Sequence, residues 1–265
     1  MTHPQRDAAP AGGRAGGGVQ SVSRALDLLE LLADAGGAQA LSQLAASSDL
    51  PLPTIHRLMR TLASRGYVRQ ERSRRYALGP RLIRLGEAAS RMLGAWARPH
   101  LAALVDVTGE TANLALLDGD EVTYVAQVPG RHAMRMFTEP GRRVLPHCTA
   151  VGKVMLAQLP AAEARGILAR SGMPAATPAT ITDPDVLLAQ LSVIRRQGYA
   201  ADEGEQEVGV RCFAAFVPDA PAMAALSVSG PQARFGHDAA SRVVPALQAA
   251  AAALSRDLAV TGHPW

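Results

Sequence analysis

Arginine, histidine and threonine side chains recur along residues 53–65, and these residue types can bond to the base edges and phosphates of DNA. The apolar residues of this segment fall at i, i+3, i+4 and i+7, which is one stripe of an α-helix: Ile55, Leu58, Met59 and Leu62. The polar residues at its start and on its other face are the candidates for DNA contact: Thr54, His56, Arg57 and Arg60. An ordinary amphipathic surface helix has the same pattern, so the neighbouring segments must decide between the two interpretations.

A shorter helix pattern precedes this segment. Its apolar face consists of Leu41, Leu44 and Ala45, and Ser42 lies near its start as a further candidate for DNA contact. Residues 47–52 match the tight turn of a helix-turn-helix. Pro53 suits the first helical position, because the N–H that proline lacks has no partner there. The two patterns together predict a helix-turn-helix whose second helix reads DNA.

An arginine-rich hairpin pattern follows the second helix. Residues 67–70 and 75–78 are predicted strands, and the polar tip between them is Glu71-Arg72-Ser73-Arg74. Arg72, Arg74 and Arg75 would contact the phosphate backbone from such a hairpin. The order helix, turn, helix and hairpin predicts a winged helix-turn-helix.

Two features in the second half of the chain predict the binding of a small anion. Residues 149–152 (Thr-Ala-Val-Gly) precede or open a helix, where backbone N–H groups and the positive end of the helix dipole converge. Ser227 and Ser229 alternate on a predicted strand, so both hydroxyls lie on one face of a sheet. A small carboxylate is expected between them. A P-loop is excluded, because Lys153 is followed by Val154 rather than by Ser or Thr.

Signals for catalysis, cofactors and metal binding are weak. The histidines are scattered without an H-E-x-x-H motif, and no G-x-S-x-G motif occurs, so we expect no metal, no cofactor and no enzyme activity. An enzyme fused to a DNA-binding domain, with Cys212 as its nucleophile, remains a rival interpretation. A constitutive architectural DNA-binding protein is a third, but it would not need the long second half.

The positive charge is concentrated in the first third of the chain. Residues 1–95 contain 13 arginines and 7 acidic residues, whereas the rest contains the other 14 of 27 basic and 16 of 23 acidic residues. This distribution is typical of a nucleic-acid-binding domain joined to another domain. Two distant cysteines and an N-terminal segment without an apolar core indicate a reducing, cytoplasmic location. The alanine-rich residues 243–260 contain Gln248, Arg256 and Asp257, which excludes a membrane span.

The remaining elements follow from periodicity and turn residues. Residues 19–34 form a predicted amphipathic helix, with Ser21 as its N-cap, Gly36 and Gly37 as its stop, and Arg24 available to a phosphate. Further helices are predicted at 81–96, 101–107, 149–159, 161–170, 184–197 and 239–260. Strands are predicted at 112–117, 121–128, 210–217 and 223–228, and residues 131–137 are a further strand or a flap. This irregular mixture predicts an α+β fold with an antiparallel sheet in the second half.

Six segments in this order resemble the IclR family of bacterial transcription regulators. They are VQSVSRALDLLELL, LPLPTIHRLMRTLASRGYV, YALGPRLIRLG, LPHCTAVGKVMLA, GYAADEGEQEVGVRCFAAFV and ALSVSGP. The resemblance implies a winged helix-turn-helix at 19–79, a linker helix at 80–96 and a GAF-like effector-binding domain at 97–265, after a disordered leader at 1–18. One departure is the pair Leu52-Pro53 where the family usually has a polar residue and Ser, which removes a serine cap and phosphate contact.

The resemblance also implies partners and a binding site. Family members bind double-stranded operator DNA as homodimers or tetramers and respond to a small organic acid, and for this chain we expect repression rather than activation. The positions that match the family's ligand contacts, together with the adjoining Gly152, are the predicted effector site: Ala150, Val151, Gly152, Asp202, Val210, Cys212, Ser227 and Ser229. Cys212 with Ser227 and Ser229 is similar to the glyoxylate-responsive repressors of allantoin catabolism, which implies glyoxylate or an allantoin-pathway metabolite as effector. An aromatic acid and pyruvate remain alternatives.

Overall fold

The structure is a computed structural model that describes residues 19–94, 96–133, 139–236 and 239–261. Its contacts divide the chain into two units, residues 1–87 and 88–265, each of which is described here by itself. Helix α4 (Arg81–Leu93), predicted as a linker, crosses the boundary between them. The predicted leader, residues 1–18, lies outside the described residues.

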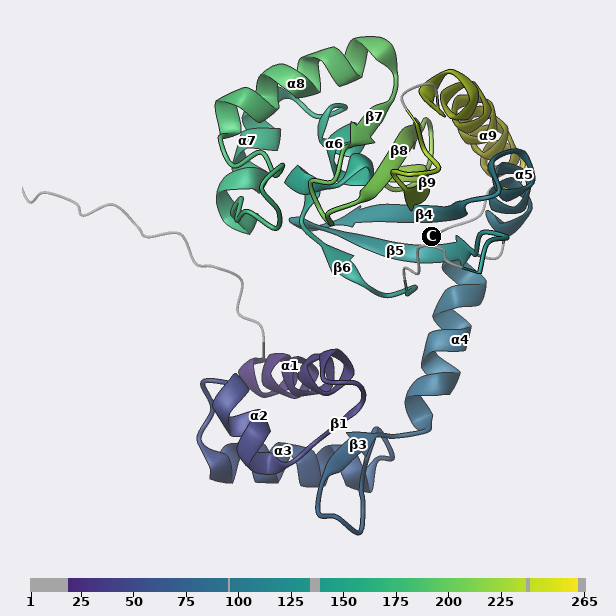
Figure 1. Ribbon diagram of the computed structural model, residues 1–265. Helices are drawn as coiled ribbons and strands as arrows, with labels where there is room; N and C mark the ends of the chain where they lie inside the picture. The colour runs from purple at the N-terminus through teal and green to yellow at the C-terminus, as the bar shows by residue number, and fades with distance from the viewer. Residues whose placement is uncertain (1–18, 95, 134–138, 237–238, 262–265) are drawn as a thin grey trace, which may run out of the picture. The chain divides into compact units, whose positions relative to one another are not determined.

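In the described part of the first unit, three helices precede α4 and accompany a small antiparallel sheet (Figure 1). The helices are α1 (Gln20–Asp34), α2 (Leu41–Ser47) and α3 (Leu52–Ser64). The strands are β1 (Ala38–Gln39), β2 (Val68–Gln70) and β3 (Tyr76–Leu78), in the order β1-β3-β2. One apolar core joins helices and sheet, and its buried members are Leu28, Leu32, Leu44, Ile55, Met59, Val68 and Tyr76. The predicted winged helix-turn-helix is confirmed.

Two local predictions for this unit are wrong, and one short strand was not predicted. Ser21 is not the N-cap of α1, because the helix begins at Gln20 and its N-cap residue is Val19, which makes no side-chain bond. Pro53 is the second rather than the first residue of α3, which begins at Leu52. Strand β1 was not predicted, since two residues are too few to show a strand period.

The base of the hairpin is closed by two glycines. A Cβ atom added to Gly79 would lie 2.2 Å from the carbonyl oxygen of Gly66, so only glycine allows these backbones to approach. Beside them the Arg81 guanidinium lies 5.8 Å from the centre of the Tyr67 ring, a cation–π contact. These contacts fix the hairpin between the end of α3 and the start of α4.

The second unit is built on a six-stranded antiparallel sheet that curls around helices (Figure 1). In the order in which they pair, the strands are β6 (Arg143–Val144), β5 (Glu121–Val128), β4 (Thr111–Asp118), β9 (Ala224–Pro231), β8 (Val210–Val217) and β7 (Ala200–Asp202). Helices α5 (Arg98–Thr108) and α9 (Ala239–Thr261) cover one face. The other face carries the short helix η1 (Pro146–Cys148), α6 (Ala150–Leu156), α7 (Ala161–Ser171) and α8 (Pro184–Gln197).

Alternation along the strands separates two apolar cores. On β8, Phe213 and Ala215 face α9, whereas Cys212 and Ala214 face α6. Both faces of the sheet are therefore covered, which explains why β8 and β9 read as nearly continuous apolar runs. The predicted α+β fold with an antiparallel sheet is confirmed.

The edge strands β6 and β7 were not predicted, because they are only two and three residues long. The predicted strand or flap at 131–137 lies mostly outside the described residues. Within the described ranges, no helix combines the length and the apolar character that crossing a membrane requires.

Candidate nucleic-acid interface and ligand pocket

The polar face of α3 is exposed and positively charged. His56, Arg57 and Arg60 are exposed, and Thr54 at the start of the helix is half-buried. Within the described residues, neither Arg57 nor Arg60 forms an ion pair. The apolar stripe of the same helix is anchored in the core by Ile55 and Met59. The sequence thus places two uncompensated cations on a rigid helical surface, which suits base edges or phosphates.

Two hydroxyls beside this face are already engaged. Thr61 Oγ1 donates to the carbonyl of Arg57 at 3.0 Å, and Ser64 Oγ donates to the carbonyl of Thr61 at 2.8 Å. On the other elements, Ser42 is exposed near the start of α2, and Arg24 on α1 is half-buried. The face is therefore dominated by cations rather than by free hydroxyls.

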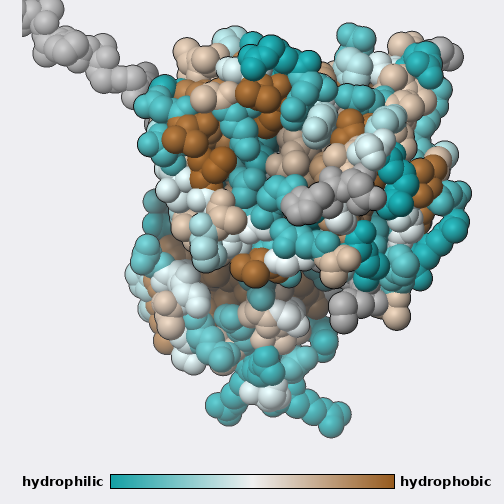
Figure 2. Space-filling model, turned by 45° about the horizontal axis from the view of Figure 1, so that its top comes forward, coloured by the Kyte–Doolittle hydropathy of each residue, from teal (hydrophilic) through white to brown (hydrophobic). Residues whose placement is uncertain are grey.

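The hairpin between β2 and β3 presents three exposed arginines that are not equivalent. The guanidinium groups of Arg72 and Arg74 have no hydrogen-bond or ion-pair partner among the described residues, whereas the Arg75 guanidinium donates to the carbonyl of Ala38 on β1. Arg74 has a left-handed φ of 62°, which turns the chain at the tip. Hydrophilic side chains cover the lower end of Figure 2, where this hairpin projects. Arg72 and Arg74 are available to an anion, and Arg75 also holds the sheet together.

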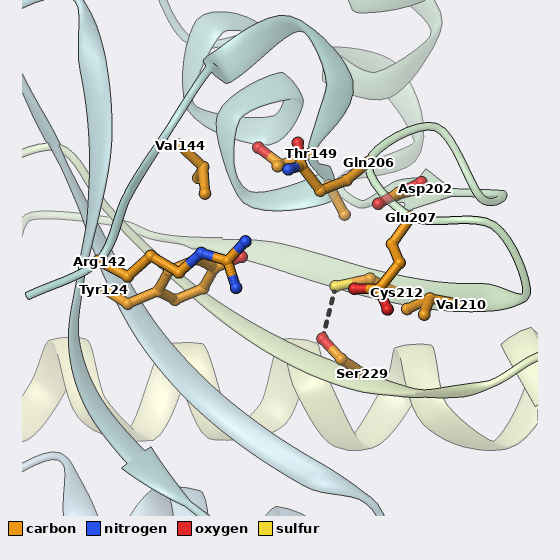
Figure 3. A pocket seen from close by; sticks show the side chains of 11 residues that line it. Tyr124, Arg142, Val144, Thr149, Asp202, Gln206, Glu207, Val210, Cys212 and Ser229 are labelled. Carbon is orange, nitrogen blue, oxygen red and sulfur yellow. Dashed lines mark hydrogen bonds between the residues drawn. The ribbon is translucent and has the colours of Figure 1, made fainter. Parts of the chain in front are cut away.

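A pocket lies in the second unit, on the face of the sheet that carries α6 (Figure 3). It encloses about 520 Å³ of empty space, including the part open to solvent. Strands β5 to β9, the start of α6 and two loops contribute its lining: Tyr124, Arg142, Val144, Thr149, Ala150, Asp202, Gln206, Glu207, Val210, Cys212 and Ser229.

Five of the eight residues predicted to bind an effector line this pocket: Ala150, Asp202, Val210, Cys212 and Ser229. The other three do not. Val151 is fully buried in the apolar core, and Ser227 is fully buried with its hydroxyl 3.4 Å from Asn113 Nδ2. Gly152 packs so closely that an added Cβ would lie 2.3 Å from the backbone of Pro146. The geometry gives these three residues packing contacts, and their role as ligand contacts stays a prediction.

Some of the hydrogen-bonding groups at the start of α6 already have partners within the protein. Thr149 is its N-cap and accepts a hydrogen bond from the Gly152 N–H at 3.2 Å, while its hydroxyl donates to the carbonyl of Leu145 at 3.3 Å. One of the backbone N–H groups predicted to bind an anion, that of Gly152, is therefore already bonded to the cap residue. Ser229 Oγ likewise donates to Cys212 Sγ at 3.1 Å rather than into open space.

Sequence reasoning missed five lining residues, Tyr124, Arg142, Val144, Gln206 and Glu207, and predicted Thr149 only as part of the helix start. Tyr124 alternates with outward-facing residues on β5, so its face could be read from the strand period once the sheet was known. Arg142 lies in the turn before β6, where no strand or helix periodicity indicates that its side chain lines the pocket. Only the pairing of β6 with β5 brings Arg142 beside Tyr124, whose N–H donates to the Arg142 carbonyl at 3.0 Å.

The acidic side of the pocket is buried and held by backbone. Asp202 is 3% exposed, and its Oδ1 accepts from the Glu205 N–H at 2.6 Å. Burial raises the pKa of the Asp202 carboxyl to about 6, although the hydrogen bonds from the following loop oppose this shift. Asp202 is thus a fixed acceptor near neutral pH and gains a proton in mild acid.

The loop after Asp202 is clamped to the helical layer. Lys153 Nζ lies 2.5 Å from Glu205 Oε1, and both side chains are buried. Thr177 donates to the carbonyl of Gly204 at 2.7 Å, and the Cys148 thiol donates to Gln206 Oε1 at 2.8 Å. Gln206 and Glu207 therefore form a positioned wall of the pocket.

Cys212 has the environment of an unreactive thiol. Burial raises its pKa to about 12, and the charge of Asp202 adds to this shift. A thiolate is the nucleophilic form, so Cys212 stays protonated and weakly nucleophilic at neutral pH. Among the described residues, no group of three or more His, Cys, Asp or Glu is arranged to hold a metal ion.

Family models match both units of the chain. The IclR helix-turn-helix domain matches residues 21–72, and the C-terminal domain of the bacterial transcriptional regulator IclR matches residues 88–256. The chain belongs to the IclR family. It is therefore a DNA-binding transcriptional regulator and not an enzyme, which confirms the predicted family and class and excludes the interpretation of Cys212 as a nucleophile.

Relatives of this IclR-family chain cover it almost end to end. It is 36% identical to the HTH-type transcriptional regulator BhcR of Paracoccus denitrificans, over 97% of this chain and 93% of that protein. It is 38% identical to the transcriptional repressor IclR of Escherichia coli, over 88% of each chain. The structure of an IclR homolog from Microbacterium hydrocarbonoxydans, complexed with 4-hydroxybenzoate, matches with a TM-score of 0.76 and 26% identity, over 91% of this chain and all of that one. Effector binding by a small molecule thus fits the family.

Proposed function

We propose that this IclR-family protein represses transcription by binding a palindromic operator as a homodimer or tetramer, with α3 in the major groove. The observation that carries the DNA-binding part is that the exposed guanidinium groups of Arg57 and Arg60 on the surface of α3 have no partner among the described residues. His56 and Thr54 would complete the base-reading face. Half-site spacing would then follow the symmetry of the assembled protein.

The contacts to the DNA backbone come from the other predicted residues. Arg72 and Arg74 at the hairpin tip would contact phosphates, with Arg75 beside them at the start of β3. Ser42 on α2 and Arg24 on α1 would contact phosphates on the other side of α3. These contacts set affinity and register, whereas the face of α3 sets the sequence preference.

The effector is a small organic acid that binds in the pocket beside α6. Glyoxylate or an allantoin-pathway metabolite is the proposed ligand, supported by the contact between Cys212 and Ser229 and by Asp202 in the same lining. An aromatic acid is the second candidate, because the homolog from Microbacterium hydrocarbonoxydans was solved with 4-hydroxybenzoate. Pyruvate is a third. To control repression, the acid must bind one DNA-binding state more tightly than the other.

The test uses the full chain and an operator selected from random duplex DNA. The selected site should be palindromic, and Arg57→Ala should bind it more weakly by about 1–3 kcal/mol. Titration of the labelled complex with glyoxylate, allantoin, allantoate, pyruvate and 4-hydroxybenzoate, followed by fluorescence anisotropy, should release the DNA for one of them. Operator binding that is indifferent to every acid would reject the effector part of the proposal and leave the DNA-binding part in place.

A further inference from the structure

The pocket has one wall of hydrogen-bond donors. Tyr124 on β5 and Arg142 in the turn before β6 extend side by side into it (Figure 3). Among the described residues, neither the Tyr124 hydroxyl nor the Arg142 guanidinium has a hydrogen-bond or ion-pair partner. Tyr124 is 8% exposed, and its burial raises its pKa, so the hydroxyl remains a donor. A carboxylate placed here would accept from both groups.

The opposite wall carries the carboxylates of Asp202 and Glu207 beside the amide of Gln206, whose Oε1 accepts from the Cys148 thiol. Asp202 ends β7 with one carboxylate oxygen tied to the Glu205 N–H, and Glu207 extends from the following loop toward Cys212 and Val210 (Figure 3). The hydrogen bonds to Gly204 and Gln206 hold the loop that carries Glu207, and the Glu205 N–H holds the Asp202 carboxylate. A ligand group that faces this wall therefore has to donate hydrogen bonds. An acceptor there would meet two carboxylates.

The hydroxyls between the two walls do not change this pattern. Thr149 is used by its cap and by the carbonyl of Leu145, and Ser229 donates to Cys212. The polarity of the pocket is therefore set by its ends, with Arg142 and Tyr124 at one and Asp202 and Glu207 at the other.

We propose that the effector is a short carboxylic acid whose other end carries hydrogen-bond donors, either hydroxyl or ammonium. Its carboxylate binds Arg142 and Tyr124, and its donors bind Asp202 and Glu207. This inference rests on the proposed effector function and narrows its ligand class. Glyoxylate satisfies it in the hydrated form, in which water has added across the aldehyde to give two hydroxyls. Pyruvate in its keto form does not, and neither does an acid with a second carboxylate.

Calorimetric titration of the full chain with four three-carbon acids tests the proposal. Lactate, alanine, pyruvate and propionate share a skeleton and differ at C2, which carries a hydroxyl, an ammonium, a keto oxygen or only hydrogen. Lactate or alanine should bind at least about tenfold more tightly than pyruvate and propionate, as expected for a hydrogen bond to a charged group. The comparison of lactate with alanine separates a hydroxyl effector from an ammonium effector.

Two exposed positions supply variants that are not expected to unfold the protein. Glu207→Gln should reduce the preference for the donor-bearing acid to about twofold or less, since it removes one charged acceptor. Arg142→Gln should weaken every carboxylate. The matched control is Arg143→Gln, because Arg143 adjoins Arg142 but pairs with Glu121 at 2.7 Å outside the pocket. That variant should bind all four acids as the wild type does.

The outcomes separate this inference from the proposed function. If lactate, pyruvate and propionate bind equally and Arg142→Gln weakens all three, the pocket binds acids but the donor requirement is wrong. If none of the four acids nor glyoxylate gives a saturable response, both the inference and the proposed effector site are overturned.

Discussion

Arginine serves different purposes in the two units. In the first unit, the exposed Arg57, Arg60, Arg72 and Arg74 have no acidic partner among the described residues. In the second unit, six arginines pair with carboxylates: Arg131, Arg143, Arg165, Arg170, Arg211 and Arg234. The first third of the chain therefore has an excess of positive charge, and several of its exposed arginines also lack a carboxylate partner among the described residues. Charge left unpaired at a surface is charge available to an outside anion.

Arg142 differs from its neighbours in the second unit in the same way. Arg143, the next residue, pairs with Glu121, whereas Arg142 lines the pocket without a partner among the described residues. The comparison therefore predicts that paired cations contribute to folding, and that unpaired cations contribute to binding. Four measurements test this distinction between paired and unpaired cations.

The largest effect is expected at the buried pair of Lys153 and Glu205. Lys153→Met leaves the Glu205 carboxylate buried without its cation and should lower the free energy of unfolding by about 3–5 kcal/mol. Adding Glu205→Gln to Lys153→Met should restore part of this loss, because the uncompensated charge is gone. Urea unfolding followed by circular dichroism measures both. A loss below about 1 kcal/mol for Lys153→Met would show that this pair does not stabilise the fold.

Asp202→Asn should change how stability depends on pH. The pKa of Asp202 is raised from 3.8 to about 6, so the wild type is favoured while the carboxyl is protonated and loses stability as pH rises through 6. Between pH 4 and pH 7 the wild type should lose about 2.5 kcal/mol relative to the variant, because one pKa unit corresponds to about 1.4 kcal/mol and the unfolded carboxyl is already partly ionised at pH 4. Asp120→Asn is the opposite control: Arg170 lowers the pKa of Asp120, so that contribution is lost as pH falls. Equal pH profiles for Asp202→Asn and wild type would contradict the burial argument.

Arg57→Ala and Arg60→Ala should each weaken operator binding by about 1–3 kcal/mol per lost base contact. The free energy of unfolding should stay within about 0.5 kcal/mol of wild type, because neither side chain has a bonded partner in the part of the chain that the structure describes. Arg165→Ala, which removes a cation paired with Asp185 in the second unit, should leave operator affinity unchanged. Anisotropy titrations at fixed salt compare the three, and wild-type affinity in Arg57→Ala would reject the assignment of α3.

The smallest effect is expected at the hairpin tip. Arg74→Gln should reduce the slope of log affinity against log salt by about 0.9, the value for one lost phosphate contact, and leave the sequence preference intact. Arg75→Gln should in addition lower the melting temperature, because it removes the bond to the Ala38 carbonyl. An unchanged salt slope in Arg74→Gln would remove this residue from the interface.

Long elements with marked ends could be predicted from the sequence. Helix α8 was predicted with its observed bounds, since Asp183 caps its start by accepting from the Asp185 N–H at 2.7 Å and Gly198 ends it with a φ of 76°. The edge strands β1, β6 and β7 were missed, because two or three residues carry no period and are created by pairing across the sheet.

The pocket was predicted only on one side. Asp202, Cys212 and Ser229 belong to sequence segments that resemble the IclR family, so they could be predicted from the sequence. Tyr124 and Arg142 are brought into the same pocket by the pairing of strands in the sheet. Neither residue has a local sequence feature that indicates this position. Ser227 illustrates the converse: it shares a sheet face with Ser229, yet packing against Asn113 removes it from the lining.

The strand order gives the pocket a mechanical consequence. Its donor wall belongs to β5 and the turn into the short edge strand β6, and its acceptor wall begins at the end of the opposite edge strand, β7. A ligand bound to both walls would link the two edges of the sheet and oppose a flattening of its curvature. The backbone amides of β6 and β7 should then exchange more slowly with deuterium when the pocket is filled, so the curvature of the sheet would itself report occupancy.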